Sequence, residues 1–523
     1  MFGNIQTNLI GYNSSIAENG FYLVDRTQLN HAEDALISGH DVILTSDVGN
    51  GKSIAAEQLS LRMTALGWRV FRVTADTKEV RKEAIQLLDA GGNIALVIDN
   101  YIPFLDLIDH FSVRRQGKNF KFILTCRSYV HDAFADRLEK RLYSTNITEI
   151  DVNRLGEDDN QKLIRMIDSF GLWSDFSAHS HQQKQNFLTN ECNNQLHQVL
   201  LRLYAAPQMS ERINRLFEDI TPQVRRLVVA AMILNLSGLL VLKETLDDLL
   251  NNSPLMHLTN TDKESVKFIW SDVAGQIKLK SSALAEHYLK NLANSGEVVG
   301  IIIEMFDSAH EIYESRIYKR PTSEQFMRSI MSFSTLQKMI PENGFRPATI
   351  RFYEAIQTKT FVRKNPHFWL QYAIARLSFE DSLTEIETYF QSAYKHAEEI
   401  NYDPFQIDNH YARLLLIRAI KEPFSVTTFS NYSKAKSIVM NQVALGATRK
   451  HYPYRVATLV LDLVKIHGEK FDQKQIKDFA LFCGDILTRI EKSNQSIREH
   501  KHTIFCKKAM SDTLRELESY TPK

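Results

Sequence analysis

The chain has 523 residues, of which 44% are hydrophobic and 24% charged, and its formal net charge at pH 7 is +1. A charge so close to zero excludes a whole-chain field that steers the protein to nucleic acid or to membranes, although a local basic patch stays open. No apolar run reaches the roughly 18–20 residues that cross a bilayer, and the first residues lack the pattern of a secretion signal. We therefore expect a cytoplasmic protein of about three or four domains that does not enter a membrane.

Residues 41–155 alternate β-rich runs with helical patterns. Five runs are predicted strands: 41–45, 69–73, 94–98, 120–125 and 147–152. Two intervening segments, 53–66 and 78–90, are predicted helices. Because strands and helices alternate with short links, we predict a parallel sheet with right-handed crossovers. The sequence thus indicates an α/β core over residues 41–155, with residues 1–40 as its lead-in.

After about residue 156 the strand signals nearly vanish. Residues 156–218 predict a small helical bundle. Residues 219–295 predict helices, then a short strand pair whose clearest strand is 275–280, and then a helix for which Ser281 or Ser282 is the expected N-cap. That order suits a winged-helix unit. Residues 296–523 predict helices only.

Aromatic and small residues recur close together in the last region. The pairs and triplets are Trp369, Tyr372 and Ala373; Tyr389, Ala393 and Ala397; Tyr411 and Ala412; Tyr432 and Ala435; Tyr454 and Ala457. A small residue near an aromatic one lets two helices approach closely, and stacked helix pairs form solenoids. The period drifts, so we predict degenerate TPR-like repeats and keep an irregular helical domain as the alternative.

The link between the first predicted strand and its helix is Ser46–Ser53. It matches the phosphate-loop pattern G-x-x-x-x-G-K-[ST] except that Ser46 replaces the first glycine, where we expect a small residue to be tolerated. Gly49 and Gly51 let backbone N–H groups turn inward as an anion nest, and the next helix points its positive end at the same place. We assign binding of ATP or GTP to the loop and the residue after it: Ser46, Asp47, Val48, Gly49, Asn50, Gly51, Lys52, Ser53 and Ile54.

Three side chains are expected to complete the phosphate and metal site. Lys52 should reach the β- and γ-phosphates, and the Ser53 hydroxyl should bind Mg²⁺. The apolar run 94–98 ends in Asp99, whose carboxylate can hold Mg²⁺ through water and face Ser53. The metal site is therefore predicted at Ser53 and Asp99.

Asn100 follows the predicted metal ligand. Many hydrolysing ATPases have a second acid at this position to polarise the attacking water, but an asparagine cannot accept a proton as a general base. We expect hydrolysis to be slow or to use another residue. The hypothesis that follows is that the nucleotide acts as a switch and not as fuel.

The fourth predicted strand ends in Thr125-Cys126-Arg127. We expect this strand between the phosphate-loop strand and the Asp99 strand, as in the additional-strand class of P-loop ATPases. Arg127 would then contact the γ-phosphate in a bidentate manner, with a purely structural arginine as the alternative. Lys52, Asp99 and Arg127 form the predicted catalytic set.

These elements together resemble the STAND class of signal-transduction NTPases, which includes NACHT and NB-ARC proteins. The matching residues are the Gly49–Ser53 loop, Asp99 after its strand, and the string at 125–127, which is similar to the T-S-R sensor of that class. The resemblance implies a P-loop NTPase core (41–155), a helical lid (156–218), a winged-helix-like domain (219–295) and TPR-like repeats (296–523).

The resemblance also implies a function. In that class ADP holds a closed monomer, and a ligand sensed by the repeats permits exchange for ATP and drives oligomerisation; bacterial members are often antiphage sensors. The implied cofactors are ATP or ADP with Mg²⁺, and the implied partners are a protein ligand or effector at the C-terminal repeats and further copies of the chain. Arg26 is implied as a contact to the base or ribose, and Pro207 as a contact to adenine.

Two features depart from the class. Many members carry a phosphate-binding histidine in the winged helix where Ser281 stands here, so Lys280 or Ser281 would have to substitute. Only about 38 residues precede the core, too few for an effector domain. We expect the effector to be a separate polypeptide, or the chain to be a fragment, or nucleotide-controlled assembly to be its whole task.

Two other functions stay open. An AAA-like motor or DNA-associated ATPase would use Arg114, Arg115 and Lys118 as contacts to a neighbouring subunit or to nucleic acid, although Asn100 argues against a fast motor. A helical-repeat adaptor with a degenerate nucleotide site is disfavoured by the intact Lys52, Ser53 and Asp99.

Overall fold

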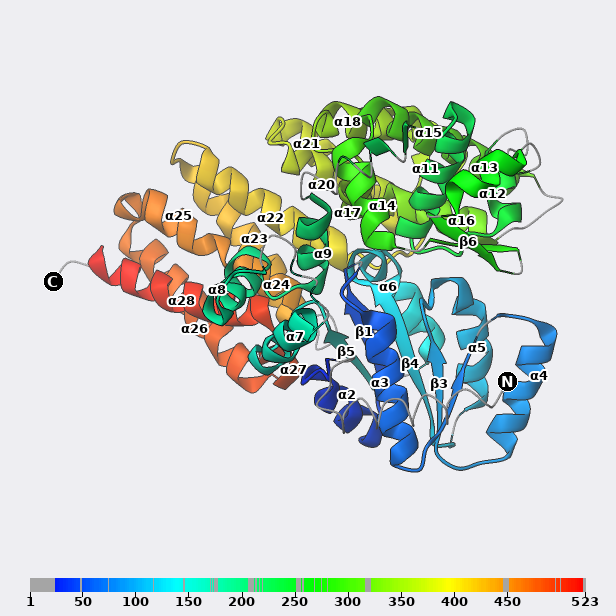
Figure 1. The fold of residues 1–523 in the computed structure, drawn as a ribbon. Coiled ribbons are helices and arrows are strands. Elements are labelled where there is room, and N and C mark those ends of the chain that lie inside the picture. Colours follow the sequence, from blue (N-terminus) through cyan, green and yellow to red (C-terminus); the bar gives the residue numbers. More distant parts are fainter. Residues whose placement is uncertain are drawn as a thin grey trace. The chain divides into compact units, whose positions relative to one another are not determined.

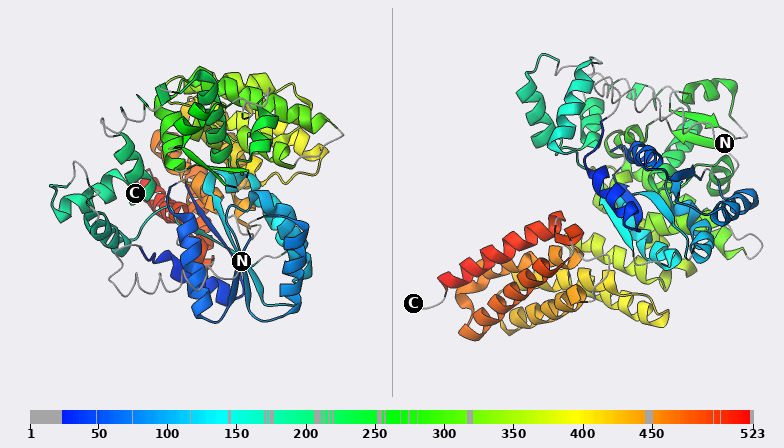
Figure 2. Two further views of the ribbon diagram at one scale, coloured as in Figure 1. Left: turned by 45° about the vertical axis from the view of Figure 1, so that its right-hand side comes forward. Right: turned by 90° about the horizontal axis from the view of Figure 1, so that it is seen from below.

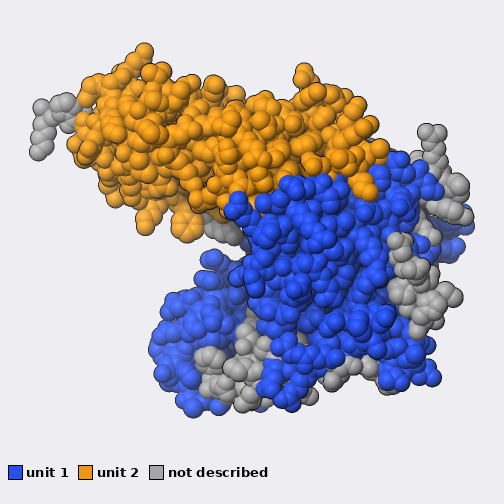
Figure 3. All heavy atoms as spheres, turned by 90° about the horizontal axis from the view of Figure 1, so that it is seen from above, with its two compact units in different colours: residues 1–356 blue, residues 357–523 orange. Residues whose placement is uncertain are grey.

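The computed structural model describes residues 24–520 apart from 48, 74, 116, 144–145, 170, 172, 174–176, 206–210, 212–213, 216, 219, 251–254, 256–257, 268, 274, 280, 316–320, 445–450, 494 and 499. The chain divides into two compact units, Met1–Ile356 and Gln357–Lys523 (Figure 3). None of the described helices is both long and apolar enough to span a bilayer.

The first unit is built on a five-stranded parallel sheet in the order β2-β3-β4-β1-β5 (Figure 1). Its strands are β1 (Asp41–Ser46), β2 (Arg69–Arg72), β3 (Ile94–Ile98), β4 (Phe120–Arg127) and β5 (Ile147–Asp151). Strands β1 and β3 are buried along their whole length, and β3 is apolar throughout, as expected for an inner strand of a parallel sheet. The predicted insertion of β4 between β1 and β3 is confirmed.

Helices cover both faces of this sheet. They are α2 (Gln28–Ile37), α3 (Lys52–Ala65), α4 (Lys78–Asp89), the short η1 (Ile102–Phe104), α5 (Leu105–Arg114) and α6 (Ser128–Leu142). On one face, α2 and α3 share a hydrophobic core with inward residues of the strands, including Ile123 of β4. On the other face, Phe111 of α5 packs against Phe120, and Phe120 against Phe122. Successive β4 side chains therefore serve opposite cores, as the pleat of a strand requires.

The remaining elements of the first unit are helical except for one hairpin. They are α7 (Glu157–Ser169), α8 (His181–Asn186), η3 (Phe187–Glu191), α9 (Leu196–Ala205), α11 (Pro222–Leu236), α12 (Lys243–Leu249), α13 (Asn260–Val266), β6 (Trp270–Val273), β7 (Gln276–Leu279), α14 (Ser282–His287), η5 (Tyr288–Leu292), α15 (Ser295–Glu314), α16 (Pro321–Met331), α17 (Phe333–Met339) and α18 (Phe345–Ile356). Strands β6 and β7 form an antiparallel pair between α13 and α14. Ser281 caps α14, since its hydroxyl accepts from the backbone N–H of Leu284 at 3.0 Å.

The second unit is all-helical where the structure describes it. Its elements are α19 (Thr360–Arg363), α20 (Pro366–Ser378), α21 (Leu383–Glu399), α22 (Phe405–Lys421), α23 (Val426–Ala444), α24 (His451–Ala457), α25 (Leu459–His467), η6 (Gly468–Lys470), α26 (Gln473–Lys492), α27 (Gln495–Arg498) and α28 (Lys501–Ser519). Consecutive helices pack side by side, α20 on α21 and α22 on α23 (Figure 2). The alanines that the sequence singled out are buried. The region predicted to be helical, 296–523, spans both units, because α15–α18 belong to the first.

A buried ion pair lies at the amino end of β1, which is the end of the strand away from the phosphate loop. The two terminal nitrogens of the Arg115 guanidinium, Nη1 and Nη2, each donate to one oxygen of the Asp41 carboxylate at 2.6 Å. The Asp41 carboxylate also accepts from the backbone N–H of Phe122 at 2.9 Å. Arg114 bonds within its own helix, and Lys118 pairs with Asp89 at 3.0 Å. The basic residues considered for nucleic-acid contact are therefore bonded within the domain.

Replacing Arg115 with methionine should strongly destabilise the first unit, because it leaves the Asp41 carboxylate buried and unpaired. Loss of one partner of a buried pair costs about 3–5 kcal/mol of unfolding free energy. Chemical denaturation would measure this loss, with exposed Arg114→Met as the matched control. The double variant Arg115→Met/Asp41→Leu should recover part of the loss. Equal stability of the Arg114 and Arg115 variants would contradict the expected role of the pair.

Candidate nucleotide-binding site

The loop between β1 and α3 has the backbone of an anion cradle. Gly49 and Gly51 have φ of 81° and 77°, a left-handed conformation that glycine adopts without strain. Helix α3 begins directly after Gly51, so its free N–H groups and positive dipole end face the loop. The predicted phosphate loop thus has the local geometry that its sequence requires.

Asp99 accepts hydrogen bonds from polar side chains near the carboxyl ends of β3 and β4. Its Oδ1 accepts from the Ser53 hydroxyl at 3.1 Å and from the Thr125 hydroxyl at 2.6 Å. Thr125 in turn accepts from the backbone N–H of Asn100 at 2.8 Å. Carboxylate and hydroxyl oxygens are ligands that suit Mg²⁺, so Ser53 and Asp99 would hold this ion, which would neutralise phosphate charge there.

The Lys52 ammonium lies close to the loop, where its Nζ donates to the carbonyl oxygen of Asp47 at 3.4 Å. The pKa of Lys52 is lowered to about 8, mainly by burial and in addition by the positive charge of nearby Arg127. A bound phosphate would compensate both effects, because it supplies negative charge to an ammonium that the protein leaves poorly neutralised.

Side chains from outside the loop hold it in place. Asn153, which follows β5, accepts through Oδ1 from the backbone N–H of Asp47 at 2.6 Å and from the Asn50 amide at 2.9 Å. Buried Arg26 donates to the carbonyl oxygens of Val152, at 2.7 Å, and of Asn50. Burial lowers the pKa of Arg26, although Asp159 partly offsets this effect. The implied nucleotide contact Arg26 is therefore placed against the loop backbone.

Residues of α9 and α14 cover the loop. A Cβ at Gly49 would lie 3.2 Å from His197 Nδ1 and 3.5 Å from the Ala283 side chain. The backbone N–H of His197 donates to Asn50 Oδ1 at 2.8 Å. His197 is buried, and its Nδ1 has no hydrogen-bond partner among the described residues. Helices α9 and α14 thus both pack on the phosphate loop.

Further side-chain contacts connect His197, Glu286, Lys338 and Asp47. Its Nε2 lies 3.6 Å from the Glu286 carboxylate, and Lys338 on α17 lies 3.6 Å from both Glu286 and Asp47. Burial raises the pKa of Glu286, but the contacts with His197 and Lys338 lower it below its usual value overall. Helix α17 is therefore linked to the loop through the Lys338–Asp47 ion pair, and to α14 through Glu286.

Arg127 and Asn100 bond to the end of α11. Arg127 Nη2 donates to Asn235 Oδ1 at 2.9 Å, and Nη1 donates to the Asn235 carbonyl oxygen. The Asn100 amide donates to the carbonyl oxygen of Gly238. The Tyr129 hydroxyl donates to the carbonyl oxygen of Leu236 at 2.6 Å. The two residues expected at the γ-phosphate edge are therefore engaged by the segment 235–238.

The other predicted residues of the loop are distributed as follows. Ser46 is fully buried, and its hydroxyl donates to the Asp47 carbonyl oxygen at 3.0 Å. Ile54 is 55% exposed on α3. Val48 and Pro207, and also Lys280, lie outside the described residues.

Comparison with known proteins identifies the first part of the chain. The family model for Novel STAND NTPase 3 matches residues 23–166. These residues are a STAND-class NTPase domain. No curated protein matches the chain.

One similar solved structure is a Signal Transduction ATPase with Numerous Domains (STAND) protein with a tetratricopeptide repeat sensor from Pyrococcus horikoshii. It shares 13% identity over 94% of this chain and 81% of its own, with a TM-score of 0.27. That score is too low to bear on the fold or the function of this chain.

Sequence reasoning missed Asn153, His197 and Asn235. Each contacts a residue that is more than 100 positions away, and none belongs to a recognised motif. Asn153 offered one signal, since it follows a predicted strand whose carboxyl end points to the loop edge. His197 and Asn235 lie in helical sequence that offered none.

The affinity for ADP with Mg²⁺ should fall as the pH rises through 8, since phosphate binds the protonated form of Lys52. With a pKa of about 8, most of this lysine is protonated at pH 7 and about a tenth at pH 9, so affinity should drop roughly tenfold. Calorimetric titration at both pH values measures this. Lys52→Arg keeps its charge over the range and should show a flat profile. A parallel decline in both proteins would contradict the role of Lys52.

Proposed function

We propose that this STAND-class protein is a nucleotide-switched sensor and scaffold. The observation that carries the proposal is that Arg127 and Asn100 donate to the segment 235–238. A γ-phosphate and that segment would compete for the same donors. ADP lacks this phosphate and leaves the docked arrangement intact, whereas ATP favours its release.

The proposed nucleotide site comprises the loop Ser46–Ile54, with Lys52 on the β- and γ-phosphates and Ser53 and Asp99 on Mg²⁺. Bound Mg²⁺ would neutralise phosphate charge and fix the nucleotide. Arg26 supports the loop backbone, and a contact of Arg26 or Pro207 with the nucleoside remains a prediction. Because the Asn100 amide is a donor and not a base, we propose slow hydrolysis.

The proposed division of labour follows the predicted domains. The core (41–155) binds nucleotide, the lid (156–218) and winged helix (219–295) close over it, and the helical region (296–523) binds a protein ligand or effector. Release of the closed arrangement would permit nucleotide-dependent self-assembly. A role in defence against phage is proposed from the class alone.

Asn235→Ala should shift the protein toward the released, assembling state. The change removes one acceptor of the charged Arg127 and the acceptor of the Ser282 hydroxyl, which lies at 2.8 Å. Loss of a hydrogen bond to a charged group is worth about 1.5–3 kcal/mol, or a shift of roughly ten- to a hundredfold in the docking equilibrium. Analytical ultracentrifugation with ADP and with a non-hydrolysable ATP analogue would measure the assembled fraction.

The matched control is Asn30→Ala, which also removes an acceptor of an arginine, Arg62 at 2.8 Å, but far from the γ-phosphate edge. It should assemble like the unmodified chain. A mass that does not differ between the two nucleotides, in the parent and in Asn235→Ala alike, would refute the switch. Steady-state hydrolysis faster than about one per second would favour a motor instead.

A further inference from the structure

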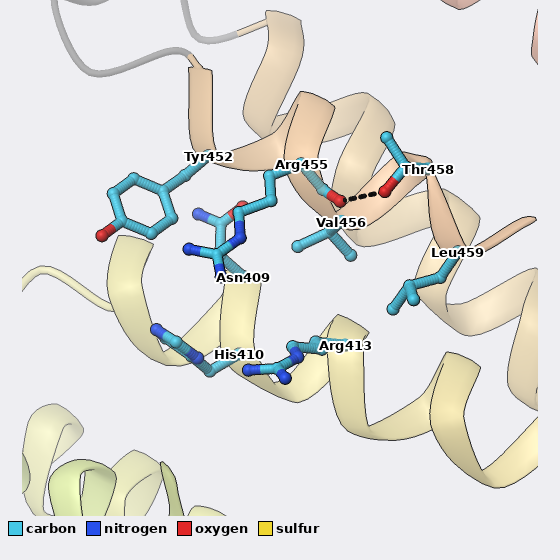
Figure 4. Close-up of a pocket in the computed structure, with 8 residues that line it drawn as sticks. All are labelled: Asn409, His410, Arg413, Tyr452, Arg455, Val456, Thr458 and Leu459. Carbon is cyan, nitrogen blue, oxygen red and sulfur yellow. Dashed lines mark hydrogen bonds between the residues drawn. The ribbon is translucent and has the colours of Figure 1, made fainter. Parts of the chain in front are cut away.

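A polar pocket lies within the second unit, between α22 and the α24–α25 junction. Its volume is about 220 Å³. Figure 4 shows His410 and Arg413 of α22 and Tyr452 and Arg455 of α24 arranged around one space. His410 and Arg413 are three positions apart and so share a helix face, as do Tyr452 and Arg455.

The two arginines of this pocket carry charges that the described chain does not neutralise. Neither guanidinium of Arg413 or Arg455 has an ion-pair or hydrogen-bond partner among the described residues. The sequence between Val443 and Leu461 contains no Asp or Glu. Burial lowers the pKa of Arg413, and the like charge of Arg455 lowers it further. Two cations thus face one cavity.

The nearest acid on α22 is committed elsewhere. The Asp408 carboxylate accepts from the Tyr394 hydroxyl at 2.7 Å and from the Gln442 amide at 2.6 Å. Burial raises the pKa of the Asp408 carboxyl. Asp408 is therefore no counter-ion for the arginines.

Neutral polar atoms complete the pocket. Burial, together with Arg413 and Arg455, lowers the pKa of His410 to about 3, so its ring is neutral at pH 7. Within the described residues, His410 Nδ1 and the Oδ1 of buried Asn409 have no hydrogen-bond partner. Such unpaired buried atoms are costly, and a ligand that bonds to them would recover part of that cost.

We propose that this pocket binds a small organic phosphate monoester. A phosphate monoester carries a charge of about −1.5 to −2 at pH 7, which matches two guanidinium groups, whereas a carboxylate matches one. Arginine binds phosphate oxygens in a bidentate manner. The rings and branched side chains of Tyr452, Val456 and Leu459 offer an apolar wall for the organic part. The volume lies below the usual range of about 300–1,000 Å³, so the ligand must be compact.

Calorimetric titration of the full chain with phenyl phosphate tests the proposal. Phenyl phosphate should bind in saturable fashion, more tightly than inorganic phosphate, which lacks the ring, and more tightly than benzoate, which lacks the second charge. Arg413→Gln and Arg455→Gln should each weaken binding by at least about tenfold. Arg489→Gln on α26, an exposed arginine of the same unit, removes the same charge and should bind normally.

Thermal unfolding without phosphate separates this role from a structural one. Because each pocket arginine is an unpaired like charge, Arg413→Gln and Arg455→Gln should not lower the unfolding temperature of the free chain, whereas a structural role would. Phenyl phosphate should raise the unfolding temperature of the parent and of Arg489→Gln only.

Several results would overturn the proposal. They are no binding up to about 10 mM phenyl phosphate, equal affinity in the parent and the pocket variants, or benzoate binding as tightly as phenyl phosphate. If inorganic phosphate bound as tightly as phenyl phosphate, the ligand of the pocket would be the free phosphate ion and not a phosphate monoester. Binding of a phosphoserine peptide, with none of the small probes, would replace it with a protein partner. Because every variant retains Lys52 and Asp99, failure here leaves the switch of the first unit untouched.

Discussion

The donors of Arg127 can be satisfied by one set of acceptors at a time. In this structure those acceptors are the carbonyl and the side chain of Asn235, at the end of a helix more than 100 residues further along the chain. The same end of α11 also receives hydrogen bonds from Asn100 and Tyr129. The relation between the sheet and the winged-helix region therefore depends on side chains at the carboxyl edge of β3 and β4, which is where the proposed nucleotide phosphates would lie.

The phosphate loop is the second place where these parts meet. Arg26 and Asn153 fix its backbone from the lead-in and from β5, while His197 and Ala283 cover Gly49 from above. Any ligand that moves this backbone also moves the packing of α9 and α14, because protein interiors have little free volume to absorb a shift. In the proposed switch, this packing would pass a local change at the phosphates on to α9 and α14.

The sheet could be predicted from sequence because short β-rich runs alternate with helical patterns and the run 94–98 is apolar throughout. The phosphate loop could be predicted because its glycines and Lys52 follow a fixed spacing. The insertion of β4 between β1 and β3 could be predicted once the loop was recognised. The partners of Arg127, Asn100 and Arg26 could not, because a polar side chain in the sequence does not indicate which distant carbonyl it will meet. Nor could the charges of Arg413 and Arg455 be assigned to one cavity, since they lie on helices 30 or more residues apart.

Asn100 occupies a position where an amide and a carboxylate would have opposite effects. It occupies the left-handed region at φ 55°, which asparagine tolerates better than most residues, and its amide faces the Gly238 carbonyl oxygen. An aspartate would fit the same backbone, but its carboxylate would meet that carbonyl oxygen as a second acceptor and repel it. An acid at this position and the docking of the segment 235–238 therefore oppose each other. In the proposed switch, a change of Asn100 to aspartate that favoured hydrolysis would at the same time weaken the docked arrangement.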